Sequence, residues 1–168
     1  MALEGVSALI LDDNANMRGL MRVILSSFGT RRVEEAADVQ EALGIMAGGD
    51  IDLAFVDFKL GGPDGLGFCR RIRNGPDSPD IYLPIIMITA YSERGRVLEA
   101  INAGVDEFLV KPVRAVDVAN RINAVIERRR SFVNSGTYFG PDRRRRDDPR
   151  YHGPLRRFGD AGTIDIDI

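Results

Sequence analysis

The chain has 168 residues, a net charge of −2 and one cysteine, Cys69. A single cysteine excludes an internal disulfide framework, and with only one histidine, His152, it argues against a zinc site built from cysteine and histidine. No segment approaches the roughly 18 consecutive apolar residues of a membrane span, and the N-terminus has no signal-peptide pattern. We therefore expect a cytoplasmic protein without membrane insertion.

Short apolar runs alternate with helical patterns through the first 130 residues. The strand candidates are 8–11, a weaker segment around Val33, 53–57, 85–88 and 107–110. Apolar residues spaced three and four apart predict helices over 17–28, 39–46, 66–72, about 92–104 and 113–126. Alternation at this spacing predicts an α/β fold, with a parallel sheet and helices on both of its faces. The Lys111–Pro112 bond, at a strand end, is a candidate cis peptide.

Polar side chains stand where four of the predicted strands end. In chain order they are Asp12, Asp13, Asp57, Thr89 and Lys111. Parallel strands bring these ends to one edge of the sheet, where open α/β sheets bind ligands. Three crowded carboxylates favour a divalent cation, and hard oxygen ligands suit Mg²⁺. Asp57 is then a candidate nucleophile that forms an acyl phosphate, while Thr89 and Lys111 hold the phosphoryl oxygens.

Four motifs at these spacings resemble the receiver domain of two-component response regulators: Asp12-Asp13, Asp57, Thr89-Ala90 and Lys111-Pro112. The resemblance covers roughly residues 5–130. It implies a flavodoxin-like, CheY-like fold with a five-stranded parallel sheet in the order 2-1-3-4-5. It also implies a signalling protein and not an enzyme, with a histidine kinase as a possible partner.

The resemblance assigns a role to each matching residue. Asp57 corresponds to the phospho-acceptor, and Thr89 and Lys111 correspond to the phosphate-sensing pair. The Mg²⁺ ligands it implies are Asp12, Asp13, Asp57 and the backbone carbonyl of Lys59.

The composition changes at Ser131, where Gly, Pro, Asp and Arg begin to dominate. We therefore predict two parts, a receiver domain over 1–130 and an arginine-rich extension over 131–168 that has no core of its own. The extension contains an imperfect repeat, because Tyr138–Arg144 recurs 13 residues later as Tyr151–Arg157. The last segment, Thr163–Ile168, alternates Ile and Asp, which is the pattern of a short strand that could join a sheet edge.

Arginines in the extension are interleaved with aspartates, and this mixed charge indicates which kind of ligand the extension could bind. A nucleic-acid partner is not expected, because carboxylates would repel the phosphate backbone. A guanidinium can read guanine, a carboxylate can accept from its donor edge, and Tyr and Arg can stack on bases. Two repeats fit a molecule with two guanines and two phosphates, which points to cyclic di-GMP.

The extension resembles that of the CheY-like cyclic di-GMP effectors, the Cle family of alphaproteobacteria. The resemblance implies a chain that binds cyclic di-GMP, docks on the flagellar motor switch protein, affects surface attachment and is recruited to the flagellated pole. Whether one dinucleotide or an intercalated dimer binds is left open. The predicted ligand residues are Tyr138, Asp142, Arg143, Arg144, Arg145, Arg146, Asp147, Arg150, Tyr151, Arg156, Arg157 and Asp160.

Two mechanisms follow from these patterns. In the first, the extension is mobile alone and orders around cyclic di-GMP, with Asp57 phosphorylation as a second input. In the second, the chain is an ordinary single-domain phosphorelay or chemotaxis response regulator whose tail is passive.

Overall fold

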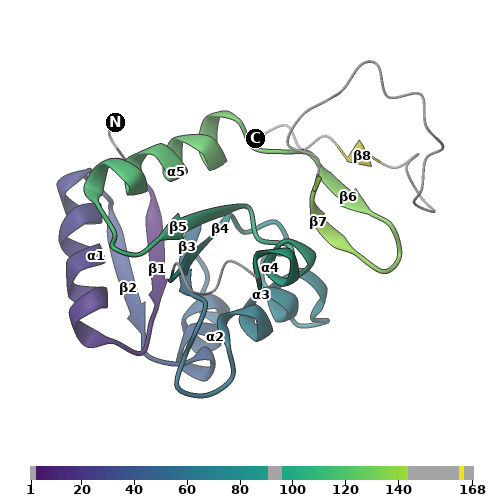
Figure 1. The fold of residues 1–168 in the computed structure, drawn as a ribbon, viewed down its shortest axis with the longest axis horizontal. Helices are drawn as coiled ribbons and strands as arrows, with labels where there is room; N and C mark the ends of the chain where they lie inside the picture. The colour runs from purple at the N-terminus through teal and green to yellow at the C-terminus, as the bar shows by residue number, and fades with distance from the viewer. Residues whose placement is uncertain (1–2, 91–95, 144–162, 165–168) are drawn as a thin grey trace.

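The computed structural model describes residues 3–90, 96–143 and 163–164, and its centre is a five-stranded parallel sheet (Figure 1). The strands lie in the order β2-β1-β3-β4-β5, which confirms the predicted fold and topology. Their bounds are β1 Ser7–Leu11, β2 Arg32–Ala36, β3 Leu53–Asp57, β4 Ile85–Thr89 and β5 Glu107–Val110. Strands β1, β3 and β4 are buried throughout, as expected for apolar strands covered on both faces.

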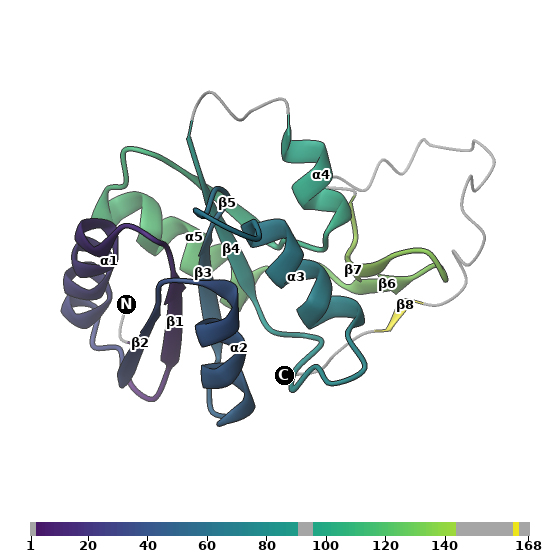
Figure 2. The same cartoon turned by 90° about the horizontal axis from the view of Figure 1, so that it is seen from below.

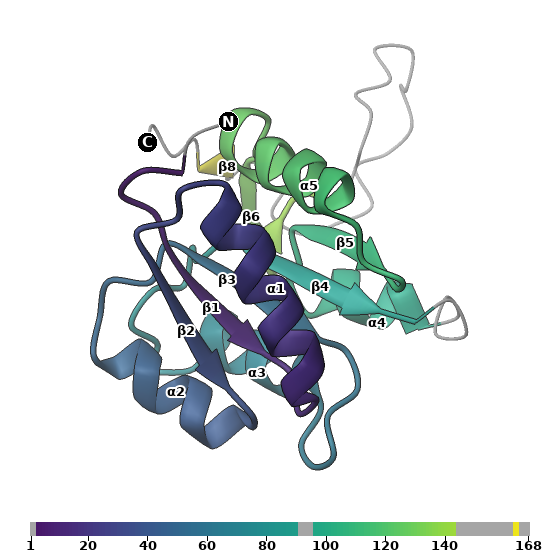
Figure 3. The ribbon, with the colours of Figure 1, turned by 90° about the vertical axis from the view of Figure 1, so that its left-hand side faces the viewer.

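Five helices cover the two faces of the sheet (Figures 2 and 3). They are α1 Ala15–Ser27, α2 Val39–Ala47, α3 Gly65–Asn74, α4 Val97–Asn102 and α5 Ala115–Glu127. Helices α1 and α5 lie on one face, and α2, α3 and α4 lie on the other. Each face has its own hydrophobic core, one including Phe55 and Ile122 and the other including Phe58 and Phe68.

Side-chain caps fix the loops that lead from strands into helices. Asn14 accepts hydrogen bonds from the backbone N–H groups of Asn16 and Met17 at the start of α1. Asp38 caps α2 in the same way, and Asp64 caps α3 by accepting from the backbone N–H of Gly67. Because each cap holds a helix start beside a strand end, the residues at the carboxyl edge of the sheet have defined positions.

A β-hairpin follows α5 and packs against the receiver. It consists of β6 Phe132–Asn134 and β7 Phe139–Pro141, which pair antiparallel, and β8 Thr163–Ile164 pairs with the other side of β6. Figure 2 shows the hairpin beside α3 and α4. The prediction that the extension has no ordered structure without a ligand therefore needs correction for 131–143, where aromatic residues anchor the chain.

The strand predicted within Thr163–Ile168 is present over Thr163 and Ile164, where it joins a sheet edge of the same chain. Residues 165–168 lie outside the described part of the structure. None of the described helices is long and apolar enough to cross a membrane.

Candidate metal and phosphorylation site

Three carboxylates meet at the carboxyl edge of the sheet, as the sequence predicts. Asp12 follows β1 and is buried, Asp57 ends β3 and is 5% exposed, and Asp13 is exposed. One carboxylate oxygen from each of the three lies within 4.8 Å of the others. Their mutual repulsion is reduced by any cation bound among them.

The surroundings of Asp12 test whether a metal ion fits this cluster. Its Oδ1 accepts a hydrogen bond of 2.8 Å from the backbone N–H of Asn14. Its Oδ2 is buried and has no hydrogen-bond partner among the residues that the structure describes. A buried carboxylate oxygen without a donor is costly unless a cation lies beside it. The all-oxygen donor set suits Mg²⁺, which Asp12, Asp13 and Asp57 would hold and which would offset negative charge there.

Lys111 supplies the positive charge of the site. Its Nζ lies 2.7 Å from Asp57 Oδ1 and 3.6 Å from Asp12 Oδ2. Partial burial alone would lower the pKa of Lys111, but the hydrogen bond and charge of Asp57, together with the charge of Asp12, outweigh it and raise the pKa. The ammonium group therefore stays charged and is placed to pair with an anion on Asp57.

The backbone at Lys111 extends the edge of the sheet. The Lys111 backbone N–H donates to the carbonyl of Thr89 over 2.9 Å, which continues the β4–β5 pairing by one residue. The Lys111–Pro112 peptide is cis, as predicted. Thr89 ends β4 beside Asp57, is 4% exposed, and its hydroxyl donates to the Ala90 carbonyl over 3.3 Å. Lys59 is an exposed loop residue two positions after Asp57. The role of its backbone carbonyl as a metal ligand remains a prediction.

Two glycines also shape the site, and the sequence analysis did not identify them. A Cβ on Gly65 would lie 2.1 Å from the Asp57 carbonyl oxygen and 2.8 Å from Val56 Cγ1, so α3 begins in direct contact with the end of β3. A Cβ on Gly61 would lie 3.2 Å from Asp13 Oδ2. The close approach of these glycines to the Asp57 carbonyl and the Asp13 carboxylate could not be read from spacing alone.

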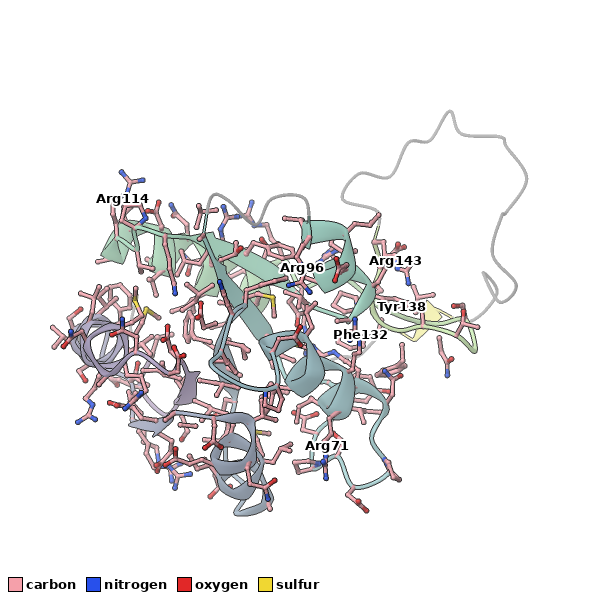
Figure 4. All side chains as sticks on the ribbon, turned by 60° about the horizontal axis from the view of Figure 1, so that its bottom comes forward. Arg71, Arg96, Arg114, Phe132, Tyr138 and Arg143 are labelled. Carbon is pink, nitrogen blue, oxygen red and sulfur yellow. The ribbon has the colours of Figure 1, made fainter. Side chains whose placement is uncertain are left out.

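Arg96 is a third residue that the sequence did not identify. Its guanidinium lies over the Phe58 ring at 4.6 Å from the ring centroid, and 3.6 Å from the carboxylate of Asp64 (Figure 4). Arg96 also pairs with Glu99 on α4. It therefore connects the start of α4 with the loop that follows Asp57, although nothing in the local sequence indicates this contact.

Only three of the predicted cyclic di-GMP ligands lie in the described part of the chain: Tyr138, Asp142 and Arg143. Tyr138 is 7% exposed, and its hydroxyl donates to the Pro141 carbonyl over 2.7 Å. The Arg143 guanidinium covers the ring, 3.9 Å from its centroid. A base could stack on this ring face only if Arg143 moved. The other predicted ligands lie outside the described residues: Arg144, Arg145, Arg146, Asp147, Arg150, Tyr151, Arg156, Arg157 and Asp160.

Comparison with known proteins defines the class. The family model for the response regulator receiver domain matches residues 8–123, so the chain belongs to the response regulator receiver family. Chemotaxis protein CheY-3 of Vibrio cholerae is 32% identical over 125 residues, which cover 74% of this chain and 95% of that protein. Chemotaxis protein CheY of Pseudomonas aeruginosa is 32% identical over 120 residues, with 71% and 95% coverage.

A solved structure supports the same assignment. The crystal structure of V. cholerae CheY4 matches with a TM-score of 0.66 at 26% identity, over 72% of this chain and 98% of that chain. Receiver domains bind Mg²⁺ in an acidic pocket, which corresponds here to the cluster of Asp12, Asp13 and Asp57. Receivers of the CheY type are generally non-enzymatic signalling domains that interact with histidine kinases and motor switch proteins. The matched family region ends at residue 123, before the extension begins.

Proposed function

We propose that the chain is a CheY-like signalling protein that binds cyclic di-GMP through its arginine-rich extension and acts on the flagellar motor or on surface attachment. The observation that carries this proposal is the repeat of an aromatic residue, a Gly-Pro turn and an arginine pair, at Tyr138–Arg144 and Tyr151–Arg157. Each repeat combines an aromatic ring with a pair of planar cations, and planar guanidinium groups suit a guanine and a phosphate. Two repeats therefore suit a cyclic dinucleotide, bound singly or as an intercalated dimer.

The state of the first repeat supports the proposal. Arg143 is held against Tyr138, and the backbone carbonyl of Asp142 accepts a hydrogen bond from Arg130 of the receiver. An arginine that is already positioned loses less conformational entropy when it binds an anion than one on a flexible chain. The first arginine of the extension, Arg143, thus has a defined position before any ligand binds.

The receiver chemistry is the second input in this proposal. An Asp57 carboxylate oxygen attacks the phosphorus of a donor, and the bond from phosphorus to the donor's leaving group breaks with its electron pair. Lys111 pairs with the transferred phosphoryl group, and the Thr89 hydroxyl donates to it. Asp12, Asp13, Asp57 and the Lys59 carbonyl would hold Mg²⁺, which would offset negative charge at the site.

Titration calorimetry with cyclic di-GMP tests the proposal. We compare the intact chain with a variant in which Arg143, Arg144, Arg156 and Arg157 are changed to Ala. The matched control removes four exposed receiver arginines, Arg31, Arg70, Arg71 and Arg114, of which Arg71 and Arg114 appear in Figure 4. We expect binding by the intact chain and the control and none by the extension variant. No binding by the intact chain refutes the ligand assignment.

An ordinary chemotaxis or phosphorelay response regulator with a passive tail is the alternative. It is favoured by the chemotaxis relatives, which this chain matches over nearly their whole length. The alternative predicts phosphorylation of Asp57 and no nucleotide binding. The same calorimetry separates the two functions, and its stoichiometry distinguishes a single dinucleotide from an intercalated dimer.

A further inference from the structure

The β6–β7 hairpin contacts the receiver at the end of the sheet opposite the acidic cluster. There, Asp106 precedes β5 and its Oδ2 accepts hydrogen bonds from Arg73 Nη2 over 3.0 Å and from the backbone N–H of Ile85 over 2.9 Å. Its Oδ1 accepts from Arg129 Nε over 3.3 Å. Arg73 is fully buried and also donates to three carbonyls, those of Gly104, Ile81 and Leu83.

Phe132, the first residue of β6, covers this buried ion cluster. Its ring centroid lies 5.2 Å from the Arg73 guanidinium and 4.7 Å from that of Arg129. The Tyr82 ring meets the Phe132 ring edge-on with centroids 5.2 Å apart, and the Phe139 ring is tilted against it at 5.4 Å. Phe132 is 1% exposed, so separating the hairpin from the receiver would expose a large apolar ring and uncover two cations.

Two glycines allow the hairpin to approach the receiver backbone. A Cβ on Gly140 would lie 2.9 Å from Gly104 Cα and 2.7 Å from the Tyr138 hydroxyl. A Cβ on Gly104 would lie 3.1 Å from the Phe139 carbonyl oxygen, and Gly104 also has a positive φ of +87°. β7 therefore packs directly on the turn between α4 and β5, at a distance that only glycine permits.

Hydrogen bonds from Arg130 close the junction between the receiver and the hairpin. This side chain donates to the backbone carbonyls of Val105 and Asp106 before β5, and to that of Asp142 after β7. The Asp142 backbone N–H in turn donates to the Ser131 carbonyl over 2.8 Å. Both ends of the hairpin are therefore tied to the receiver.

We propose that residues 131–143 are a structural lobe of the receiver, and that Tyr138 is a positioning residue that holds Arg143 at a fixed place on this lobe (Figure 4). The lobe places the first arginine of the extension beside the α4–β5 turn. Tyr138 acts through Arg143 and does not itself stack on a guanine. The assignment of the lobe stands on the contacts above, whereas the positioning role rests on the proposed cyclic di-GMP binding.

The lobe is tested without any ligand, in the full chain. Gly140→Val forces a side chain into the contact with Gly104, and we expect Tm to fall by about 5 °C or more. Thr137→Ala, at the exposed tip of the same hairpin, is the matched control and should melt like the unmodified chain. Equal Tm values for the two variants would show that the hairpin is not part of the cooperative unit.

Hydrogen exchange on the unmodified chain gives an independent measurement that needs no variant. We expect the amide of Asp142, bonded to Ser131, to exchange at least about a hundredfold more slowly than in an unstructured chain. Exchange at the unstructured rate would overturn the lobe even if Gly140→Val fails to fold.

Calorimetry with cyclic di-GMP tests the positioning role. Tyr138→Leu removes the aromatic face under Arg143 and should weaken binding about tenfold. Tyr138→Phe keeps the ring while losing the hydrogen bond to Pro141, and should stay within about threefold of the unmodified chain. Equal affinities for all three chains would overturn the positioning role. If the unmodified chain binds no cyclic di-GMP, both the proposed function and the role of Tyr138 fail. The melting and hydrogen-exchange measurements still test whether residues 131–143 form a lobe of the receiver.

Discussion

Lys111 Nζ and Asp57 Oδ1 lie 2.7 Å apart at the carboxyl edge of the sheet. This pair places a cation on the oxygen atom of the candidate phospho-acceptor. The same ammonium is 3.6 Å from Asp12 Oδ2. The Lys111 ammonium therefore neutralises part of the negative charge of the acidic cluster that a metal ion would also bind. Lys111 and a bound metal ion compete for that charge.

Changing Lys111 to Gln should strengthen Mg²⁺ binding about tenfold, equivalent to about 1.4 kcal/mol, because it removes the competing ammonium. Calorimetric titration with Mg²⁺ measures the effect. Lys59→Gln is the control, since it removes an exposed lysine and keeps the backbone carbonyl. An unchanged Mg²⁺ affinity in Lys111→Gln would mean that the two cations do not share the site.

Changing Asp57 to Asn should abolish binding of beryllofluoride, a phosphoryl mimic, in the presence of Mg²⁺. The amide lacks the negative oxygen that coordinates beryllium, and it weakens the metal site by one charge. Chemical shifts of backbone amides near Thr89 and Lys111 report the binding. Asp117→Asn, a carboxylate on α5 paired with Arg114, is the control and should respond like the unmodified chain. A full response by Asp57→Asn would refute the assignment of the phospho-acceptor.

Gly65→Ala should disturb the metal site through the backbone. The new Cβ would lie 2.1 Å from the Asp57 carbonyl oxygen, so either β3 or α3 must shift, at a cost of about 1–3 kcal/mol in the free energy of unfolding. Mg²⁺ affinity should fall in the same variant. Gly67→Ala, two residues along α3, places a Cβ in ordinary contact with Asp64 Oδ1 at 3.7 Å and should raise stability by up to about 1 kcal/mol. Similar behaviour of the two variants would contradict the close contact.

Arg73→Met should lower the free energy of unfolding by about 3–5 kcal/mol, because it leaves the buried Asp106 carboxylate without its closest cation and three carbonyls without donors. Urea unfolding measures the loss. Arg70→Met, at an exposed position of the same helix, is the control and should change stability by less than about 0.5 kcal/mol. Adding Asp106→Asn to Arg73→Met should recover part of the loss, and no recovery would mean that the charge pair is not its cause.

Cys69 should react about a thousandfold more slowly with a thiol reagent at pH 8 than an exposed cysteine does. Burial is the main reason that the pKa of this thiol is raised from 9.0 to about 12, so very little thiolate is present. Because the folded chain holds this proton more tightly, its contribution to stability is complete below pH 9 and is lost as the pH rises towards 12. Ellman's reagent, with and without denaturant, measures the difference. Fast reaction of the folded chain would show that Cys69 is accessible.

The pattern of the sequence by itself determined the alternating strand–helix units and the cluster of Asp12, Asp13, Asp57 and Lys111, whereas the order of the strands was implied by the resemblance to receiver domains. Buried parallel strands require continuous apolar runs, and the residues that follow them necessarily meet at one edge, so local patterns were sufficient. The tertiary structure alone decided the docking of the hairpin. Arg73 and Asp106 are 33 positions apart, and Gly104 and Gly140 are 36 apart. No periodicity encodes such pairs, because they depend on how the ends of α3, α4 and α5 pack together. For that reason composition alone assigned the aromatic residues of 131–143 to a tail, whereas Phe132 packs against Arg73, Arg129 and Tyr82 of the receiver.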